Sequence, residues 1–280
     1  MIWRCRDVAF DLSARTLVMG VLNVTPDSFS DGGRYLDPDA AIARGRELLA
    51  QGADLLDLGA ESTRPGSAPV PAAEQLRRLE PVLAALASEP GAVLSVDTRS
   101  AEVAARALEL GAHVVNDVSA LGDPDMAAAL APSGAGLVLM HMRGTPATMQ
   151  GDLRYDDVVA EVAAHLRRRM AVAVAAGIAE ERIALDPGIG FGKSAEQSLR
   201  LLARTDDLAA LGRPVLVGAS RKSFLARLLG DAPADRRLEA SLAAATLAAF
   251  LGARILRVNE VAETVRVVKV ADGARAARRA

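Results

Sequence analysis

Two kinds of segment alternate along the chain. Short runs rich in leucine, valine and isoleucine are followed by longer stretches in which apolar residues recur with a helical period among alanine and arginine. The short runs predict eight strands, at 17–24, 54–58, 93–97, 113–118, 136–142, 183–186, 214–218 and 254–258. The longer stretches predict helices, for example at 38–50, 72–88, 101–110 and 156–176.

Strands that alternate with helices form a parallel sheet through βαβ units. Eight such units without linker-like composition between them predict one α/β domain over residues 1–280, a single closed (β/α)8 TIM barrel. A doubly wound open sheet is the alternative, but its glycine-rich turn is missing after the first strand, where Asn-Val-Thr-Pro-Asp stands at 23–27. We expect residues 2–12 to form a short hairpin at the barrel floor, and the tail 273–280 to fray.

Composition narrows the class of protein. Apolar residues make up 51% of the 280 residues, which is enough for a large core. The net charge of −2 gives no reason to expect nucleic acid or a membrane surface as a partner. The lone cysteine, Cys5, permits no internal disulfide, so we expect a cytoplasmic protein. Residues 1–6 are too few and too charged for a signal peptide, so none is expected. A membrane span is not expected either, since the nearest candidate, the apolar stretch 240–253, is too short.

Polar residues stand at or just beyond the C-terminal end of every predicted strand, which is where TIM barrels place their active sites. Capping of the following helix is an alternative role for aspartate, asparagine and serine, and for any single residue it is equally plausible. Lysine and arginine are not N-cap residues, so capping does not explain the whole set. In strand order the set is Asn23, Asp57, Asp97, Asn116, His141, Asp186, Lys222 and Arg257.

Three stretches carry further signals. Residues 19–33 end in a polar, glycine-containing segment that is typical of a mobile loop. The segment Asp-Pro-Gly-Ile-Gly-Phe-Gly-Lys at 186–193 has three glycines that let backbone approach a ligand closely. The segment Gly-Ala-Ser-Arg-Lys-Ser at 218–223 opens a predicted helix with serine, arginine and lysine, a pattern that favours anion binding.

These stretches, with Glu-Ser-Thr-Arg-Pro-Gly at 61–66, Ser-Val-Asp-Thr at 95–98 and Asn-Asp-Val-Ser at 116–119, resemble the dihydropteroate synthase family of pterin-binding enzymes. The resemblance runs from about residue 17 to the final helix. It implies a transferase of folate biosynthesis that condenses 6-hydroxymethyl-7,8-dihydropterin pyrophosphate with 4-aminobenzoate, giving 7,8-dihydropteroate and pyrophosphate. It also implies a homodimer, for which the apolar helix at 240–253 is a candidate interface.

The resemblance further implies roles for single residues. Asp186 would accept two neighbouring N–H groups of the pterin, which a carboxylate suits. Asn23 matches a position linked to Mg²⁺, and Arg257 matches the arginine that binds pyrophosphate, whose departure both cations would assist. Asp97, Lys222 and Arg257 are the implied catalytic residues. The 4-aminobenzoate, which sulfonamides would mimic, is expected near the helix that begins after 222. The remaining implied substrate contacts are Thr63, Arg64, Pro65, Asn116, Phe191, Gly218, Ser220 and Asn259.

Two departures from the family pattern leave alternatives open. Arg-Val-Asn-Glu stands at 257–260 where Arg-Val-His-Asp is usual, and Gln-Ser stands at 197–198 where His-Asn is common. The first bears on pyrophosphate binding and keeps a non-catalytic pterin-binding paralogue possible, whereas the second affects helix packing. A methyltransferase acting on methyltetrahydrofolate is a further alternative, although it would need neither the loop at 23–33 nor the anion site at 220–222. Structural roles are expected for Asp57, Asp117, His141 and Lys193.

Overall fold

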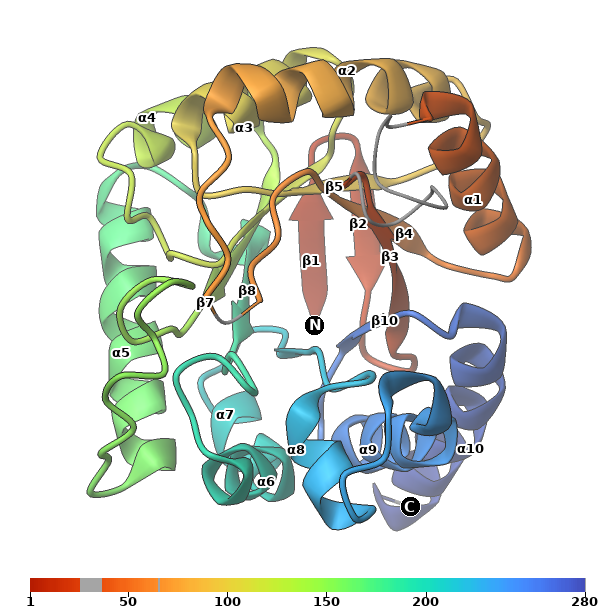
Figure 1. Ribbon diagram of the computed structural model, residues 1–280, viewed down its shortest axis with the longest axis vertical. Helices are drawn as coiled ribbons and strands as arrows, with labels where there is room; N and C mark the ends of the chain where they lie inside the picture. The colour runs from red at the N-terminus through yellow and green to blue at the C-terminus, as the bar shows by residue number, and fades with distance from the viewer. Residues whose placement is uncertain (26–36, 65, 280) are drawn as a thin grey trace.

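A parallel barrel forms the centre of the molecule (Figure 1). The computed structural model describes residues 1–25, 37–64 and 66–279. Over these residues, eight strands form one sheet in the order β8-β7-β6-β5-β4-β3-β10-β9, and a bridge from Leu185 to Val215 nearly closes it into a ring. The predicted TIM barrel is therefore confirmed. Its strands are β3 (Leu17–Asn23), β4 (Leu55–Gly59), β5 (Leu94–Asp97), β6 (Val114–Asp117), β7 (Gly136–Met140), β8 (Ile183–Asp186), β9 (Leu216–Val217) and β10 (Ile255–Val258).

Helices follow the strands and surround the barrel (Figure 1). Side-chain caps explain why several helices begin where the sequence predicts. Asp37 caps α1, Ser100 caps α3 and Asp157 caps α5, each accepting from a backbone N–H of the first turn. The helices are α1 (Pro38–Ala50), α2 (Ala72–Ala87), α3 (Ala101–Glu109), α4 (Met126–Leu130), α5 (Val158–Ala175), α6 (Ala195–Ala203), α7 (Thr205–Ala209), α8 (Ser223–Leu228), α9 (Leu238–Phe250) and α10 (Val261–Arg279), with short 3-10 turns at η2 (Ala131–Ser133), η3 (Glu180–Arg182) and η4 (Ala234–Arg236).

An N-terminal hairpin closes the floor of the barrel, as predicted. Strands β1 (Ile2–Cys5) and β2 (Val8–Asp11) pair antiparallel. Trp3 and Cys5 are fully buried and pack in one cluster with the first inward-facing residues of the barrel strands. The indole nitrogen of Trp3 donates to the carbonyl oxygen of Arg182 at 3.0 Å, which ties the hairpin to the residue just before β8.

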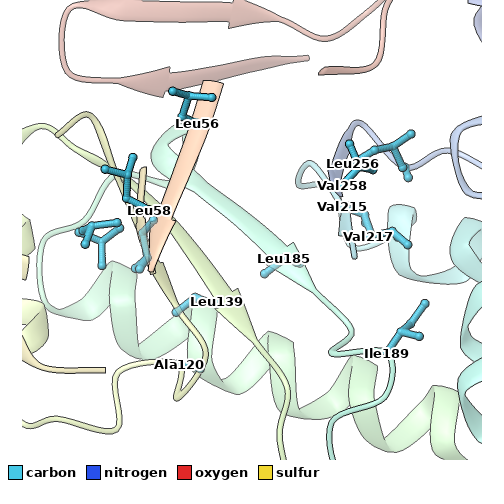
Figure 2. Close-up of a cluster of buried hydrophobic side chains, with 14 of the residues drawn as sticks. Leu56, Leu58, Ala120, Leu139, Leu185, Ile189, Val215, Val217, Leu256 and Val258 are labelled. Atoms are coloured by element: carbon cyan, nitrogen blue, oxygen red, sulfur yellow. The ribbon is translucent and has the colours of Figure 1, made fainter. Parts of the chain in front are cut away.

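The strand side chains divide between two cores because successive residues of a strand face opposite sides. Leu56, Leu58, Leu139 and Leu256 belong to the outer core, which lies between the sheet and the helices and is drawn in Figure 2. The alternate positions belong to the inner core, inside the barrel. The strand residues of that inner core are Leu17, Met19, Leu55, Val114, Val138, Ala184, Leu216 and Ile255.

The described part of the C-terminal tail is helical, so the expectation that residues 273–280 fray was wrong for residues 273–279, and residue 280 lies outside the described residues. Helix α10 continues to Arg279. Buried Arg275 fixes this end, because its guanidinium donates to the carbonyl of Ala249 at 2.7 Å and pairs with Asp272 at 2.6 Å. Asp272 in turn accepts at 2.8 Å from the hydroxyl of Thr16, the residue just before β3. In the part of the chain that the structure describes, none of the helices is long and apolar enough to cross a membrane.

Candidate active site

Polar side chains fill the C-terminal mouth of the barrel interior. The inner-core residues Leu55, Val114, Ala184 and Ile255 are each followed, two positions later, by a polar residue on the same face. The apolar floor of the barrel therefore gives way to a polar mouth. The inward polar set consists of Asp57 on β4, Asp97 on β5, Asn116 on β6, Asp186 on β8 and Arg257 on β10.

Asp57 lies at the centre of this set. Its carboxylate is fully buried and accepts from Ser95 Oγ at 2.6 Å and from Asn116 Nδ2 at 3.0 Å. It also accepts from Arg257 Nε at 2.6 Å. One carboxylate therefore fixes side chains from three other strands.

Arg257 joins Asp57 to a second carboxylate. Its Nη2 donates to Asp97 Oδ2 at 2.9 Å, while three of its five N–H groups are not used in these two bonds. Burial raises the pKa of Asp97 to about 7; Arg257 lowers it, but Asp57, Glu61 and Asp117 add to the rise. Burial opposes the charge of Arg257, yet the two carboxylates raise its pKa above the usual range. The guanidinium stays charged and has donors left for an anion.

Asn116 presents an acceptor toward the site. Its Nδ2 donates to Asp57 Oδ2, which assigns the amide so that Oδ1 faces away from that carboxylate. Asn116 is buried, and among the described residues its Oδ1 has no hydrogen-bond partner. An unpaired buried acceptor costs about 1–3 kcal/mol, so a ligand N–H at this position would be favoured.

Asp186 ends β8 and begins the glycine-rich loop 186–193. Its Oδ1 accepts from the backbone N–H of Gly188 at 2.7 Å. Burial raises the pKa of Asp186, while Lys222, this N–H and Lys193 oppose the rise. A carboxylate with four lone-pair sites retains acceptor capacity after one bond. Asp186 and Asn116 together make one side of the mouth rich in acceptors.

Lys222 faces Asp186 from the segment before α8. Its ammonium donates to the carbonyl of Ile189 and lies 4.2 Å from the centre of the Phe191 ring. Although Lys222 keeps partial exposure, burial lowers the pKa of its ammonium to about 8, against the attraction of Asp186 and Asp97. The structure thus brings Asp186, Phe191 and Lys222 together, as the sequence predicts.

Ser220 and Asn259 meet next to this lysine. Ser220 Oγ donates to Glu260 at 2.7 Å and accepts from Asn259 Nδ2 at 2.9 Å. Glu260 also accepts from Arg221 Nε. Gly218 lies on the same side, where an added Cβ would stand 3.7 Å from Arg257 Cβ. The backbone N–H of Asn259 also donates to Ser220 Oγ, at 3.3 Å, so the proton and both lone pairs of this hydroxyl are used within the protein.

The remaining predicted residues lie at the rim. Asn23 ends β3, is exposed, and pairs in register with Gly59, which is in turn the neighbour of Asp97. The loop 61–67 carries Thr63 and Arg64 and is held by a hydrogen bond from Gly66 N to the carbonyl of Pro146 at 3.0 Å. Pro65 and residues 26–36 of the predicted mobile loop lie outside the described residues.

Sequence reasoning assigned Asp57 only a structural role and missed its central position. The signal that could have found it is the period of two along β4, because Leu55 faces inward and Asp57 must share that face. The same reasoning separates Asp117, which faces away and accepts from Ser119 and Leu121 N–H groups at 2.8 and 2.6 Å. Gln197 completes a capping box with Ser194 at the start of α6, and Ser198 accepts from the backbone N–H of Gly190 at 3.2 Å, so this departure from the family pattern also reaches the glycine-rich loop.

Comparisons with known proteins agree with this geometry. A family model described as "Pterin binding enzyme" matches residues 19–259. The dihydropteroate synthase of Escherichia coli strain K12 is 45% identical over 255 residues, which cover 91% of this chain and 90% of that protein. A probable bifunctional folylpolyglutamate synthase/dihydropteroate synthase of Haloferax volcanii is 45% identical over 260 residues, and this chain spans only 31% of that longer protein.

Solved structures give the same result. The Yersinia pestis dihydropteroate synthase, in a sulfonamide drug complex, is 43% identical with a TM-score of 0.93; the match covers 99% of this chain and 100% of that one. The Xanthomonas albilineans dihydropteroate synthase with 4-aminobenzoic acid is 45% identical with a TM-score of 0.91 and 99% coverage of both chains.

Proposed function

Because the chain belongs to the pterin-binding enzyme family, we propose that it catalyses the dihydropteroate synthase reaction of folate biosynthesis. It is a transferase that joins 6-hydroxymethyl-7,8-dihydropterin pyrophosphate to 4-aminobenzoate and releases pyrophosphate. The observation that carries the proposal for this chain is the unpaired buried acceptor of Asn116, at the same mouth of the barrel as the buried carboxylate of Asp186. Such a set of acceptors fits the edge of a pterin, which presents an amino group and a ring N–H side by side.

The pterin is held between the acceptors and Lys222. Asp186 accepts from the amino group and the adjacent ring N–H, and Asn116 Oδ1 accepts from a further N–H of the pterin ring system. The ammonium of Lys222 donates to the pterin carbonyl or a ring nitrogen. The bonds to Asp186 and Asn116 satisfy buried acceptors, and charge-assisted bonds are about twice as strong as neutral ones. The orientation of the reacting carbon follows from these contacts.

The bond to pyrophosphate breaks as positive charge develops on the exocyclic carbon. Asp97 faces this carbon as a carboxylate and stabilises the charge electrostatically. Arg257 directs its free N–H groups to the departing pyrophosphate, with Asn259 as a weaker neutral donor. The amine nitrogen of 4-aminobenzoate then forms a C–N bond in place of the broken C–O bond and releases its proton to solvent, which completes the transfer.

A Mg²⁺ ion would be held at the rim by Asn23 together with the phosphates of the substrate. Among the described residues there is no group of three or more histidine, cysteine, aspartate or glutamate side chains that could hold a metal by itself. Asn23 offers one amide oxygen at the rim, and Mg²⁺ commonly takes one or two protein ligands, substrate phosphates and several waters. When bound, Mg²⁺ would neutralise negative charge on the leaving pyrophosphate.

The 4-aminobenzoate lies between the loop 61–67 and the segment 218–223. Phe191 and the alkyl stem of Lys222 cover its ring, and Thr63, Arg64 and Ser220 line the pocket. Sulfonamides compete for this pocket, since they share the shape and charge pattern of 4-aminobenzoate. Because Ser220 donates its proton to Glu260, the carboxylate of the substrate must take its hydrogen bonds from backbone N–H groups or arginine.

The protein works as a cytoplasmic homodimer. Helix α9 supports the dimer, because its sequence is apolar on nearly every face and Leu247 remains 39% exposed. Helix α10 packs against α9 and adds Val270, which is 68% exposed. The single cysteine, buried as a free thiol, suits a reducing compartment.

A synthase assay tests the proposal. Purified protein with Mg²⁺ and the pterin pyrophosphate should release pyrophosphate only when 4-aminobenzoate is also present. The matched control omits 4-aminobenzoate, and a second control omits the enzyme. Release no faster than in the enzyme-free control would overturn the activity and favour a binding-only paralogue.

A further inference from the structure

Lys193 is the last residue of the glycine-rich loop 186–193. It is one of three lysines in the chain, and its side chain is buried, with 4% exposure. Its ammonium donates to the carbonyls of Gly188 at 3.0 Å and Phe191 at 2.9 Å. It also donates to the carbonyl of His141, just after β7, at 3.2 Å. A single side chain therefore joins two carbonyls of the loop to the residue that follows β7.

His141 completes the shell around this ammonium. Its Nδ1 lies 2.9 Å from Lys193 Nζ. Burial, with the charge of Lys193 next in size, lowers the pKa of His141 to about 2, so the ring is neutral and Nδ1 can accept. Four acceptors thus converge on a group with three N–H donors, and one donor is shared. Burial lowers the pKa of Lys193 to about 7 against the attraction of Asp186. The four acceptors around Nζ favour its ammonium form, because a neutral amine has only two N–H donors for them.

The loop backbone is shaped to deliver these carbonyls. Gly188, Gly190 and Gly192 have φ values of 65°, 82° and 61°, a region that favours glycine. At Gly188 an added Cβ would stand 2.0 Å from the carbonyl oxygen of His141, so no other residue fits there. The carbonyls of residues 188 and 191 bond to Lys193, whereas the carbonyl of Ile189 between them bonds to Lys222.

Two substrate-binding groups depend on this loop conformation. The N–H of Gly188 holds Asp186 Oδ1 at 2.7 Å, so the position of Gly188 sets the orientation of the carboxylate. Ile189 O and the Phe191 ring both contact the ammonium of Lys222. A change in the position of the loop would therefore shift both the acceptor and the donor that grip the pterin.

We propose that Lys193 is a positioning residue for the pterin site, which acts through its carbonyl contacts to hold Asp186 and Lys222 in register. The proposal rests on the proposed synthase function. Without the ammonium, three buried carbonyls would lose their donor, and the loop would rearrange to find other partners. Because a displacement of about 1 Å can reduce catalytic efficiency by about 100-fold, the effect should be large although Lys193 touches no substrate.

Three variants of the full-length protein test this role. Lys193→Met keeps the length and apolar stem of the side chain but removes every donor. Lys193→Gln keeps a neutral donor, so it should keep part of the contact. Lys269→Met is the matched control, because this lysine is exposed on α10, far from the loop in sequence. For each variant we would measure the melting temperature, the affinity for 6-hydroxymethylpterin by calorimetry, and the KM for each substrate.

We expect Lys193→Met to weaken pterin binding by about 10- to 100-fold, with a smaller loss in Lys193→Gln and none in Lys269→Met. The KM for 4-aminobenzoate should rise as well, because Phe191 and Lys222 also cover that substrate, but the KM for pterin pyrophosphate should rise more, because only the pterin contacts Asp186. A general loss of folded protein would lower the apparent kcat and leave both KM values unchanged. Wild-type pterin affinity in folded Lys193→Met, or equal changes in both KM values, would overturn the proposal. If only Lys193→Gln folds, its pterin affinity and its two KM values are judged by the same criteria. Failure of both variants to fold would also overturn the proposal. An inactive wild-type protein would instead refute the synthase function.

Discussion

Replacing Asp57 by asparagine tests whether one buried carboxylate holds the site together. Asparagine has nearly the same shape, but it exchanges one acceptor for a donor and removes the negative charge. Arg257 Nε, Ser95 Oγ and Asn116 Nδ2 all donate to this carboxylate, at 2.6, 2.6 and 3.0 Å. In the variant at least one of these donors faces another donor.

The size of the effect follows from burial. Breaking a buried ion pair from one side costs about 3–5 kcal/mol, because the remaining charge stays buried without compensation. Asp97 still accepts from Arg257, so we expect the lower end, about 3 kcal/mol. For a chain of this size that corresponds to a fall in melting temperature of about 6–12 °C. Pterin affinity should fall as well, because the amide of Asn116 loses the acceptor that orients it.

Thermal unfolding and calorimetric titration with 6-hydroxymethylpterin measure both effects. Asp207→Asn is the matched control, since Asp207 pairs with Arg204 at 2.5 Å but the two side chains are 39% and 59% exposed. An exposed pair contributes about 0–1 kcal/mol, so this control should melt close to the wild type. If the two variants lose equal stability, or if Asp57→Asn binds pterin normally, the central role of Asp57 is refuted.

Three further predictions concern the mouth of the barrel. Asp186→Asn should weaken pterin binding by about 2–5 kcal/mol, because a donor then faces a donor, and a large fall in melting temperature with unchanged pterin affinity would contradict this role. The catalytic efficiency, kcat/KM, should rise with pH as Asp97 ionises near pH 7 and should fall as Lys222 loses its proton near pH 8. The variant Lys222→Arg should lose the fall at alkaline pH, and a flat profile in the wild type would contradict both assignments. Asn259→His should bind pyrophosphate more tightly below about pH 6.5, where histidine is charged, and an affinity that does not change with pH would show that residue 259 does not contact the anion.

The barrel could be predicted from the sequence because its signals are local and repeated. Alternation of buried strands with amphipathic helices fixes the class, and caps such as Asp37 and Asp157 fix where helices begin. The helical end of the chain could not be predicted from such local signals. Arg275 and Asp272 look like ordinary surface charges in sequence, yet contacts to Ala249 and Thr16, far along the chain, make the helix continue.

The site shows the same division. Strand ends and the rule for barrel active sites predict which residues gather at the mouth, and Asp97, Asn116, Asp186 and Arg257 do gather there. Which of them touch each other depends on the stagger of the strands, which no local pattern records. The bond between Arg257 and Asp57 joins residues 200 positions apart, so only the closed barrel brings them together.

Charge stoichiometry explains why the pKa values at the mouth move in opposite directions. Asp57 and Asp97 share Arg257. Burial raises the pKa of Asp97 more than Arg257 lowers it, and the two carboxylates together raise the pKa of the guanidinium. Lys222 has no carboxylate at ion-pair distance among the described residues and donates to a neutral carbonyl, so burial dominates and its pKa falls. A mouth so balanced can accept a neutral ring among its acceptors without burying further charge. The anionic end of the substrate then meets the unused N–H groups of Arg257 at the rim, so the substrate's own polarity matches that of the site.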